Sequence, residues 1–365
     1  MIDPHTDASA ALPLALMQLG YSSQFAAAFG KLAELGDEPA RVLAVHRDRL
    51  VISTSDGEHS ATLDARLRKG EALDRPATGD WVAVHATGSE VLGVRALVPR
   101  RSAFIRGAAG QKATPQVVAA NIDLALIVTA LPGDFNERRL ERYLALTWES
   151  GAMPVIVLTK CDLVPDADEF VTTARSLAPG VDVMTIAADS DDGVTVLQSL
   201  IPHAATIALL GSSGVGKSTL VNRLAGEEVM RTGKVVVDGR GRHTTTHREL
   251  RRLASGLLVI DTPGMRALQL WSADAGIHQV FDDIIALSES CRFADCGHGN
   301  EPGCAVMDAL HTGQLDEERL ASWRKLVRES ARARLEGDAV AASAERAKLR
   351  VMMRSVRELY RLKPK

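Results

Sequence analysis

Apolar runs of strand length alternate with amphipathic segments of helical length between residues 123 and 260. The expected strands cover residues 123–129, 154–158, 181–187, 206–210, 247–253 and 256–260, and the expected helices cover residues 136–150, 168–177, 194–200 and 218–224. Continuous apolar strands are typical of parallel sheets that are buried on both faces. The alternation therefore predicts an α/β domain with a mostly parallel sheet and helices on both faces. Ligands bind to such sheets at the carboxyl ends of the strands.

The pattern changes between residues 38 and 105, where Gly and Pro separate five short strand-like runs. The runs cover residues 41–46, 49–54, 59–63, 80–85 and 90–95. Five short strands favour a small closed β-barrel of the OB type, a fold that often binds single-stranded nucleic acid. Here, however, basic and acidic residues nearly balance and aromatic side chains are few. We expect Trp81 in the core, with docking by shape or through a loop such as Arg66–Lys69.

The ends of the chain have helical patterns. Apolar side chains recur at helical spacing in residues 1–36 and again in residues 305–312 and 316–361. Residues 106–122 are rich in Gly and other small residues, and we interpret them as a linker. The predicted parts are a helical lead-in, the barrel, the α/β domain and a helical C-terminal domain, at residues 1–37, 38–105, 106–275 and 276–365.

Composition is that of a globular protein, with 46% hydrophobic and 24% charged residues among 365. The net charge is −3, yet 14 Lys and Arg stand against five Asp and Glu from Arg319 to the end. This asymmetry favours a polyanionic partner for the C-terminal end; a solvated arginine-rich helix is the alternative. No apolar run approaches the roughly 20 residues of a membrane span, and the acidic start argues against a signal peptide. We expect a cytoplasmic monomer without a membrane partner.

Residues Gly211–Ser218 read G-x-x-x-x-G-K-S, the pattern of a phosphate-binding P-loop, between an expected strand and an expected helix. The glycines let backbone N–H groups converge on phosphate oxygens, and the helix N-terminus adds partial positive charge. Lys217 brings a full charge to the β- and γ-phosphates, and the Ser218 hydroxyl can ligate Mg²⁺. The predicted phosphate-binding residues are Gly211, Ser212, Ser213, Gly214, Val215, Gly216, Lys217, Ser218 and Thr219.

The segment Thr159-Lys160-Cys161-Asp162 directly follows the expected 154–158 strand and is a candidate guanine site. The Asp162 carboxylate can accept hydrogen bonds from N1–H and the exocyclic amine of guanine, a donor pair that adenine lacks. Lys160 can lay its apolar stem along the plane of the base. An ATP-using enzyme is therefore disfavoured.

Two further segments complete the predicted nucleotide site. Asp261-Thr-Pro-Gly264 follows the 256–260 strand; Asp261 suits a water-mediated Mg²⁺ contact and the Gly264 N–H suits a γ-phosphate contact. Residues 239–247 combine glycines, charges and three threonines, which predicts a mobile loop. Thr245 in this loop can close over Mg²⁺ and the γ-phosphate as a switch element.

The segment Cys291-x4-Cys296-x-His298-x5-Cys304 is a candidate metal site. Three thiolates and one imidazole can close a tetrahedral structural zinc site, and the glycines between them let the ligands converge. Three of the four cysteines lie within 14 positions, which favours metal over disulfides. Cys161 lies apart from this cluster, and we expect it to pack rather than to ligate.

The order of these motifs resembles that of one family. In most GTPases the guanine-reading motif follows the P-loop and D-x-x-G, whereas here residues 159–162 precede both. With a barrel before and a Cys/His cluster after, the chain resembles the RsgA (YjeQ) family of circularly permuted GTPases over about residues 40–310. The resemblance implies GTP hydrolysis with Mg²⁺, one structural Zn²⁺, and binding to the small ribosomal subunit and its rRNA late in maturation. It also implies that the subunit stimulates hydrolysis.

The chain lacks one residue that many GTPases use to orient the attacking water. They place a glutamine just after D-x-x-G, whereas this chain has Met265, whose thioether cannot do that task. We therefore expect slow intrinsic hydrolysis and strong activation by a partner. His243 and His247 are the candidate replacements within the chain. The alternative function is a nucleotide-sensing RNA-binding protein in which hydrolysis is incidental.

Two features depart from the family pattern. Thr159 stands where Asn is more usual, which keeps base selectivity but removes one amide that tethers the loop. The second base-side motif, typically S-A, appears only as Ala187-Ala188.

Overall fold

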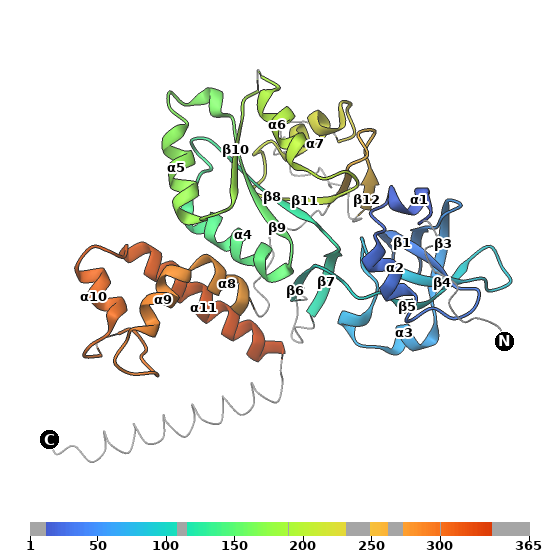
Figure 1. The fold of residues 1–365 in the computed structure, drawn as a ribbon, viewed down its shortest axis with the longest axis horizontal. Coiled ribbons are helices and arrows are strands. Elements are labelled where there is room, and N and C mark those ends of the chain that lie inside the picture. The colour runs from blue at the N-terminus through green and yellow to red at the C-terminus, as the bar shows by residue number, and fades with distance from the viewer. Residues whose placement is uncertain are drawn as a thin grey trace, which may run out of the picture. The chain divides into compact units, whose positions relative to one another are not determined.

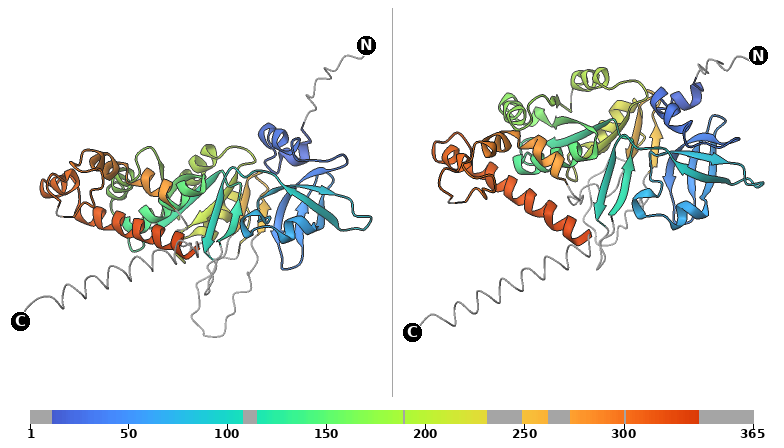
Figure 2. Two further views of the ribbon diagram at one scale, coloured as in Figure 1. Left: turned by 90° about the horizontal axis from the view of Figure 1, so that it is seen from below. Right: turned by 60° about the horizontal axis from the view of Figure 1, so that its bottom comes forward.

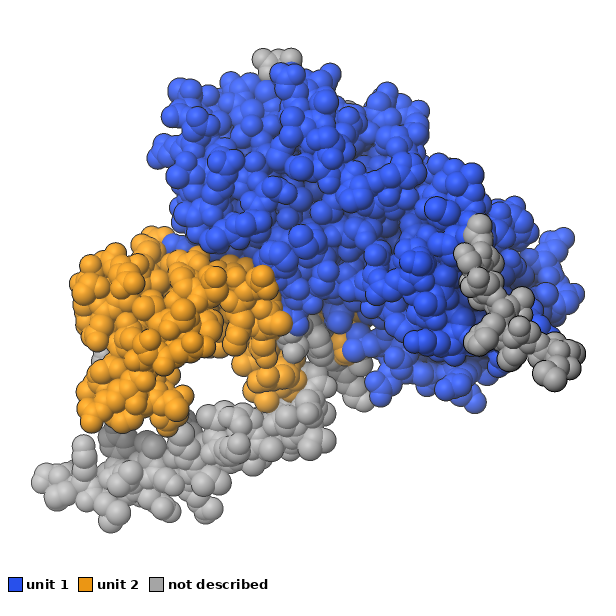
Figure 3. Space-filling view, viewed as in Figure 1, with its two compact units in different colours: residues 1–105, 117–267 blue, residues 106–116, 268–365 orange. Residues whose placement is uncertain are grey.

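The computed structural model describes residues 12–107, 115–188, 190–230, 249–261, 273–299 and 301–337. Within those ranges, no helix combines the length and the apolar character that a membrane crossing requires. The chain divides into two compact units, which Figure 3 colours separately. The first unit comprises residues 1–105 and 117–267, and the second comprises residues 106–116 and 268–365.

The first unit contains the predicted five-stranded barrel (Figure 1). Its strands are β1 (Glu38–Val45), β2 (Leu50–Ser53), β3 (Glu58–Leu63), β4 (Trp81–His85) and β5 (Leu92–Leu97). Neighbouring strands are antiparallel except β3 and β5, and β1 pairs with both β2 and β4, so the barrel closes. The small aliphatic core consists of Ala40, Val42, Leu50, Ile52, Ala61, Val82, Val84 and Val94.

The connection from β3 to β4 carries two short helices, α3 (Ala65–Lys69) and η1 (Ala72–Asp74). The predicted loop at Arg66–Lys69 is therefore wrong, because these residues are helical. Arg, Leu and Lys are good helix formers, and Leu67 packs against the barrel core.

Two helices precede the barrel, α1 (Leu14–Met17) and α2 (Ser23–Phe29). Leu16, Tyr21 and Phe25 form an apolar cluster with Trp81, whose side chain is fully buried. The ring centroids of Tyr21 and Trp81 are 4.7 Å apart. Trp81 is thus a core residue, as predicted, and is not available to stack on a nucleic-acid base.

The segment expected to be a linker, residues 106–122, contains the end of one strand and the whole of another. β6 (Ala103–Gly107) and β7 (Pro115–Ala120) pair in a separate two-stranded sheet. The glycines at residues 107 and 110 dominated the sequence pattern, whereas the β-branched pair Val117 and Val118 is buried.

The remainder of the first unit is the predicted α/β fold. Its strands are β8 (Leu124–Ala130), β9 (Met153–Thr159), β10 (Asp182–Ile186), β11 (Thr206–Leu210), β12 (Glu249–Arg252) and β13 (Leu258–Asp261). Five of them are parallel in the order β10-β9-β8-β11-β13, and β12 pairs antiparallel with β13. The mostly parallel sheet is confirmed.

Four helices cover the two faces of this sheet. They are α4 (Glu137–Ser150), α5 (Asp168–Leu177), α6 (Asp192–Leu200) and α7 (Lys217–Ala225). α4 and α5 lie together on one side, and α6 and α7 lie together on the other (Figures 1 and 2). Sheet residues such as Val128 and Val157 pack in one cluster with Leu197 of α6 and Leu220 of α7. Burial of these apolar side chains fixes the helices that carry the site.

The barrel and the α/β sheet are continuous, because Ala44 of β1 pairs with Glu249 of β12. Arg41 is fully buried at this junction and donates to the Asn121 carbonyl at 3.2 Å and to the Thr206 hydroxyl at 3.1 Å. Desolvation lowers the pKa of Arg41 to about 10, so the guanidinium remains charged at neutral pH. One arginine thus joins the barrel to β11, the strand that leads into the P-loop.

The second unit is helical, as predicted. Its helices are α8 (Asp274–Val280), α9 (Asp282–Glu289), α10 (Ala305–His311) and α11 (Glu317–Gly337). α11 is fastened near its N-terminus by Arg319, which pairs with Asp283 at 2.7 Å. Further along, the Ser330 hydroxyl donates to Asp274 at 2.8 Å and accepts the Ala273 N–H at 2.9 Å.

Candidate nucleotide site and metal centre

The P-loop connects the carboxyl end of β11 to the N-terminus of α7, which begins at Lys217. Gly211 has φ 139°, and an added Cβ would lie 2.2 Å from the Val128 carbonyl oxygen. Only glycine therefore allows the loop to pass so close to β8. Gly214 and Gly216 also have positive φ, at 79° and 98°.

Lys217 folds back over the loop that precedes it. Its Nζ donates to the Gly211 carbonyl at 2.9 Å and also to the Ser212 carbonyl. The ammonium group and the N-terminus of α7 thus lie at the same loop, which concentrates positive charge there. A separate cleft of about 620 Å³ between α6 and α7 is lined by the predicted residue Thr219 but by none of residues 211–218.

The Thr159–Asp162 segment contacts the P-loop directly. The buried Thr159 hydroxyl donates to the Val215 carbonyl at 2.7 Å, and Lys160 Nζ donates to the Gly214 carbonyl at 3.1 Å. Lys160 has a left-handed backbone with φ 58°, which turns the chain out of β9 into a short 3-10 helix, η2 (Cys161–Leu163). Thr159 replaces the more usual Asn and lacks its amide, but the Thr159 hydroxyl tethers the base-side loop to the P-loop instead.

The Ala187-Ala188 segment lies beside the predicted base-reading carboxylate. The Ala188 N–H donates to Asp162 Oδ1 at 3.0 Å, across 26 residues of sequence. Arg223 of α7 donates in turn to the Ala187 carbonyl at 2.7 Å. Arg223 could not be singled out from the sequence, because an arginine near the end of an amphipathic helix carries no local signal.

The remaining predicted nucleotide residues are only partly described. Asp261 ends β13, the strand next to β11. The predictions for His243, Thr245, His247 and Gly264 lie outside the described residues, as does Met265.

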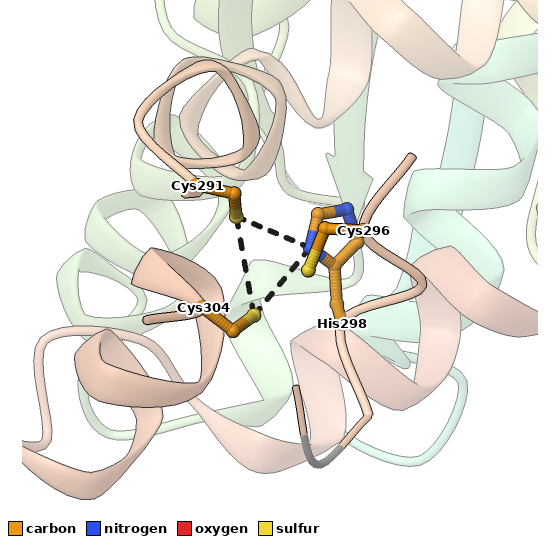
Figure 4. Close-up of side chains that lie close together, drawn as sticks. All are labelled: Cys291, Cys296, His298 and Cys304. Carbon is orange, nitrogen blue, oxygen red and sulfur yellow. Dashed lines mark hydrogen bonds between the residues drawn. The ribbon is translucent and has the colours of Figure 1, made fainter. Parts of the chain in front are cut away.

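The second unit brings the four predicted metal-binding residues together (Figure 4). Their donor atoms lie within 4.8 Å of one another. Cys291 Sγ is 3.9 Å from Cys304 Sγ, and His298 Nδ1 is 3.5 Å from the first sulfur and 3.6 Å from the second. Cys304 and His298 are buried, whereas Cys291 and Cys296 are half-buried. The side chains point toward one centre, and Cys161 belongs to the other unit.

The loop around His298 is held by residues outside the sequence motif. His298 itself has a left-handed backbone with φ 55°, which is rare for a residue with a side chain. Glu301 accepts the Gly297 and Gly299 N–H groups at 3.1 and 2.6 Å, and Arg324 of α11 donates to the His298 carbonyl. Burial lowers the pKa of His298, because desolvation disfavours the imidazolium, and the neutral ring is the form that binds metals.

These loops appear along the chain in an unusual order. The base-side loop follows β9, the P-loop follows β11, and the D-T-P-G segment starts at the end of β13. All three strands are parallel, so the loops share one edge of the sheet. The fold and the loops define a P-loop GTPase with circularly permuted motifs, preceded by a barrel.

Comparisons with known proteins identify the family. The family model described as RsgA GTPase matches residues 97–271. A small ribosomal subunit biogenesis GTPase RsgA from Opitutus terrae is 45% identical over 91% of this chain and 94% of its own length. A protein of the same name from Syntrophotalea carbinolica is 41% identical over 93% and 96% of the two chains. The chain belongs to the RsgA GTPase family.

Solved structures share the fold. YjeQ from Thermotoga maritima covers 81% of this chain and 99% of its own, with a TM-score of 0.59 and 21% identity. YloQ, described as a circularly permuted GTPase, covers 81% and 95%, with a TM-score of 0.58 and 23% identity. Because the sequence identities to these two structures are below 25%, the similarity establishes a shared fold and nothing more.

Proposed function

We propose that this chain hydrolyses GTP as an assembly factor in late maturation of the small ribosomal subunit, and that the subunit stimulates hydrolysis. The observation that carries the proposal is the pair of hydrogen bonds from Thr159 and Lys160 to the P-loop. A base-reading loop and a phosphate loop joined in this way suit one guanine nucleotide. The names of the relatives, small ribosomal subunit biogenesis GTPases, supply the ribosomal context.

In this proposal Asp162 reads guanine, and the P-loop backbone with Lys217 holds the phosphates. Ser218, Thr245 and Asp261 would hold Mg²⁺, which neutralises charge on the phosphates when it is bound. Gly264 contacts the γ-phosphate through its N–H. With Met265 in place of glutamine, His243 or His247, or a group of the partner, orients the attacking water.

We further propose that Cys291, Cys296, His298 and Cys304 hold one structural Zn²⁺. With Zn–S near 2.3 Å and Zn–N near 2.05 Å, a regular tetrahedron has S···S edges of about 3.8 Å and S···N edges of about 3.6 Å. The three edges that join Cys291, His298 and Cys304 measure 3.9, 3.5 and 3.6 Å and fit that geometry, and the Cys296 sulfur lies within 4.8 Å of the other three donors. The bound ion would close the loop and leave no open position for catalysis.

The rRNA partner is proposed from the charge of α11. Lys325, Arg328 and Arg332 are exposed and follow one another at three and four positions, which places them on one face of the helix. Such a row of positive charge suits a phosphate backbone. We propose that the protein acts as a monomer in the cytoplasm, where ribosomal subunits assemble.

The test is GTP turnover with and without purified small subunits, together with co-sedimentation in GDP and in a non-hydrolysable GTP analogue. We expect stimulation of at least about tenfold, given that the water-orienting glutamine is missing. The variants His243→Ala and His247→Ala then show whether the group that orients the attacking water belongs to this chain or to the partner. Loss of stimulation assigns it to the chain, and full stimulation assigns it to the partner. If subunits bind but turnover does not rise, the alternative applies, namely a nucleotide-sensing RNA-binding protein.

A further inference from the structure

Arg223 of α7 contacts the loop between β10 and α6 through its described residues Ala187, Ser190 and Asp191. Its guanidinium donates to the Ala187 carbonyl at 2.7 Å and also to the Ser190 carbonyl. It forms an ion pair with Asp191 at 2.6 Å, and its side chain is only 19% exposed. Three acceptors of one loop are therefore satisfied by one planar group, which suits the forked donor geometry of arginine.

The same loop is restrained at its far end. Gly193, in the first turn of α6, lies so close to β10 that an added Cβ would be 2.2 Å from the Thr185 carbonyl oxygen. The Ser190 hydroxyl donates to Asp192 at 2.9 Å and accepts the Asp192 N–H at 3.1 Å. The loop is thus anchored to α6 on one side and, through Arg223, to the P-loop helix on the other.

The loop reaches the predicted base-reading residue through one hydrogen bond. The Ala188 N–H donates to Asp162 Oδ1 at 3.0 Å. A carboxylate has about four acceptor positions, so this bond leaves lone pairs on both oxygens for two donors of a base. It also limits rotation of the exposed Asp162 side chain. The position of the carboxylate therefore depends on the loop, and the loop depends on Arg223.

We propose that Arg223 is a positioning residue that sets selectivity for guanine, because it holds residues 187, 190 and 191 of the loop whose Ala188 N–H orients Asp162. The proposal rests on the proposed function, in which Asp162 accepts from N1–H and the exocyclic amine of guanine. Hypoxanthine has the N1–H but lacks the amine. The ratio of the dissociation constants for IDP and GDP therefore reports how well Asp162 is placed, whereas the phosphate contacts are common to both nucleotides.

The experiment measures GDP and IDP affinities by titration calorimetry for the full chain and for Arg223→Ala. We expect the GDP affinity, which depends on both hydrogen bonds to Asp162, to fall about tenfold, and the IDP affinity, which depends on the N1–H bond alone, to fall by a smaller factor of about threefold. Arg223→Lys keeps the charge but cannot reach three acceptors, so we expect an intermediate ratio. Arg175→Ala, at an exposed position on α5, is the matched control and should keep the original ratio.

Two outcomes overturn the proposal. If Arg223→Ala and Arg223→Lys weaken GDP and IDP equally, the arginine only stabilises α7. If both variants leave the GDP and IDP affinities unchanged, the arginine has no role in nucleotide binding. Asp162→Ala distinguishes these results from failure of the proposed function. If Asp162→Ala loses the preference for GDP over IDP and the Arg223 variants keep it, the role of Arg223 is rejected and guanine reading by Asp162 stands. A preference kept in Asp162→Ala rejects guanine reading by Asp162 and the role of Arg223 with it.

Discussion

The nucleotide loops and the cysteine loop each hold several polar groups at one point. They differ in how those groups are brought together. The nucleotide loops are joined by hydrogen bonds between residues far apart in the chain. Thr159 and Val215 are 56 residues apart, and Ala187 and Arg223 are 36 apart. The cysteine loop instead collects its four donors from a single stretch that ends 13 residues after Cys291.

The difference concerns what stabilises each site. The nucleotide loops stand on a sheet whose apolar core already fixes the strands, so each hydrogen bond only adjusts a position. The described residues of the cysteine loop, 291–299 and 301–304, form turns and bends rather than strands. We therefore expect the first site to persist without its ligand and the second to depend on its metal.

Removal of zinc should have the largest effect on local structure. It tests directly whether the cysteine loop, unlike the nucleotide loops, depends on its ligand. Structural Zn²⁺ contributes on the order of 10 kcal/mol in small domains, so a chelator should abolish hydrogen-exchange protection in residues 291–304. GDP binding should remain. Cys304→Ala should behave as the chelated protein, whereas Cys161→Ala should keep one zinc per chain by atomic absorption. Full protection after chelation would contradict the metal dependence.

Loss of Lys217 should have the next largest effect, now confined to the nucleotide loops. Lys217→Ala removes a charge-assisted contact to phosphate, and we expect GDP affinity to fall about 100-fold, or about 3 kcal/mol. Zinc content should not change. Lys325→Ala, on the exposed face of α11, is the matched control and should bind GDP normally. The role of Lys217 is wrong if its variant binds GDP within about twofold of the parent.

Arg41→Met tests whether long-range contacts stabilise the first unit as a whole. The change removes donors to the Asn121 carbonyl and the Thr206 hydroxyl and leaves buried acceptors unpaired. We expect the free energy of unfolding to fall by about 2–3 kcal/mol in denaturant titrations. Thr206→Val removes one of these acceptors and should have the smaller effect. An unchanged unfolding midpoint for Arg41→Met would show that the barrel holds its place without this residue.

Thr159→Val should have the smallest effect. The substitution keeps the shape of the side chain and removes the donor to the Val215 carbonyl, a bond of 2.7 Å. We expect GDP affinity to fall about fivefold, which corresponds to about 1 kcal/mol. Thr159→Ser keeps the hydroxyl and should bind as the parent does. Equal affinities for the valine and serine variants would mean that the hydroxyl does not tether the loop.

Much of the architecture could be predicted because its signals are local. The apolar runs at residues 154–158 and 206–210 lie within the observed β9 and β11, and the barrel follows from five short strands. The failures also have local causes. Glycines concealed β6 and β7, and the charged residues of α3 resembled a loop although arginine and lysine are good helix formers.

The sequence by itself determined the P-loop, the base-side motif and the Cys/His cluster, because each depends on spacing within one short segment, and their permuted order follows from their positions along the chain. Only the tertiary structure decided that Thr159 tethers the P-loop and that Arg223 holds the loop beside Asp162. The reason is physical. A donor and an acceptor that are distant in the chain leave no periodicity or spacing to read, and they meet only after hydrophobic burial has set the sheet and its helices.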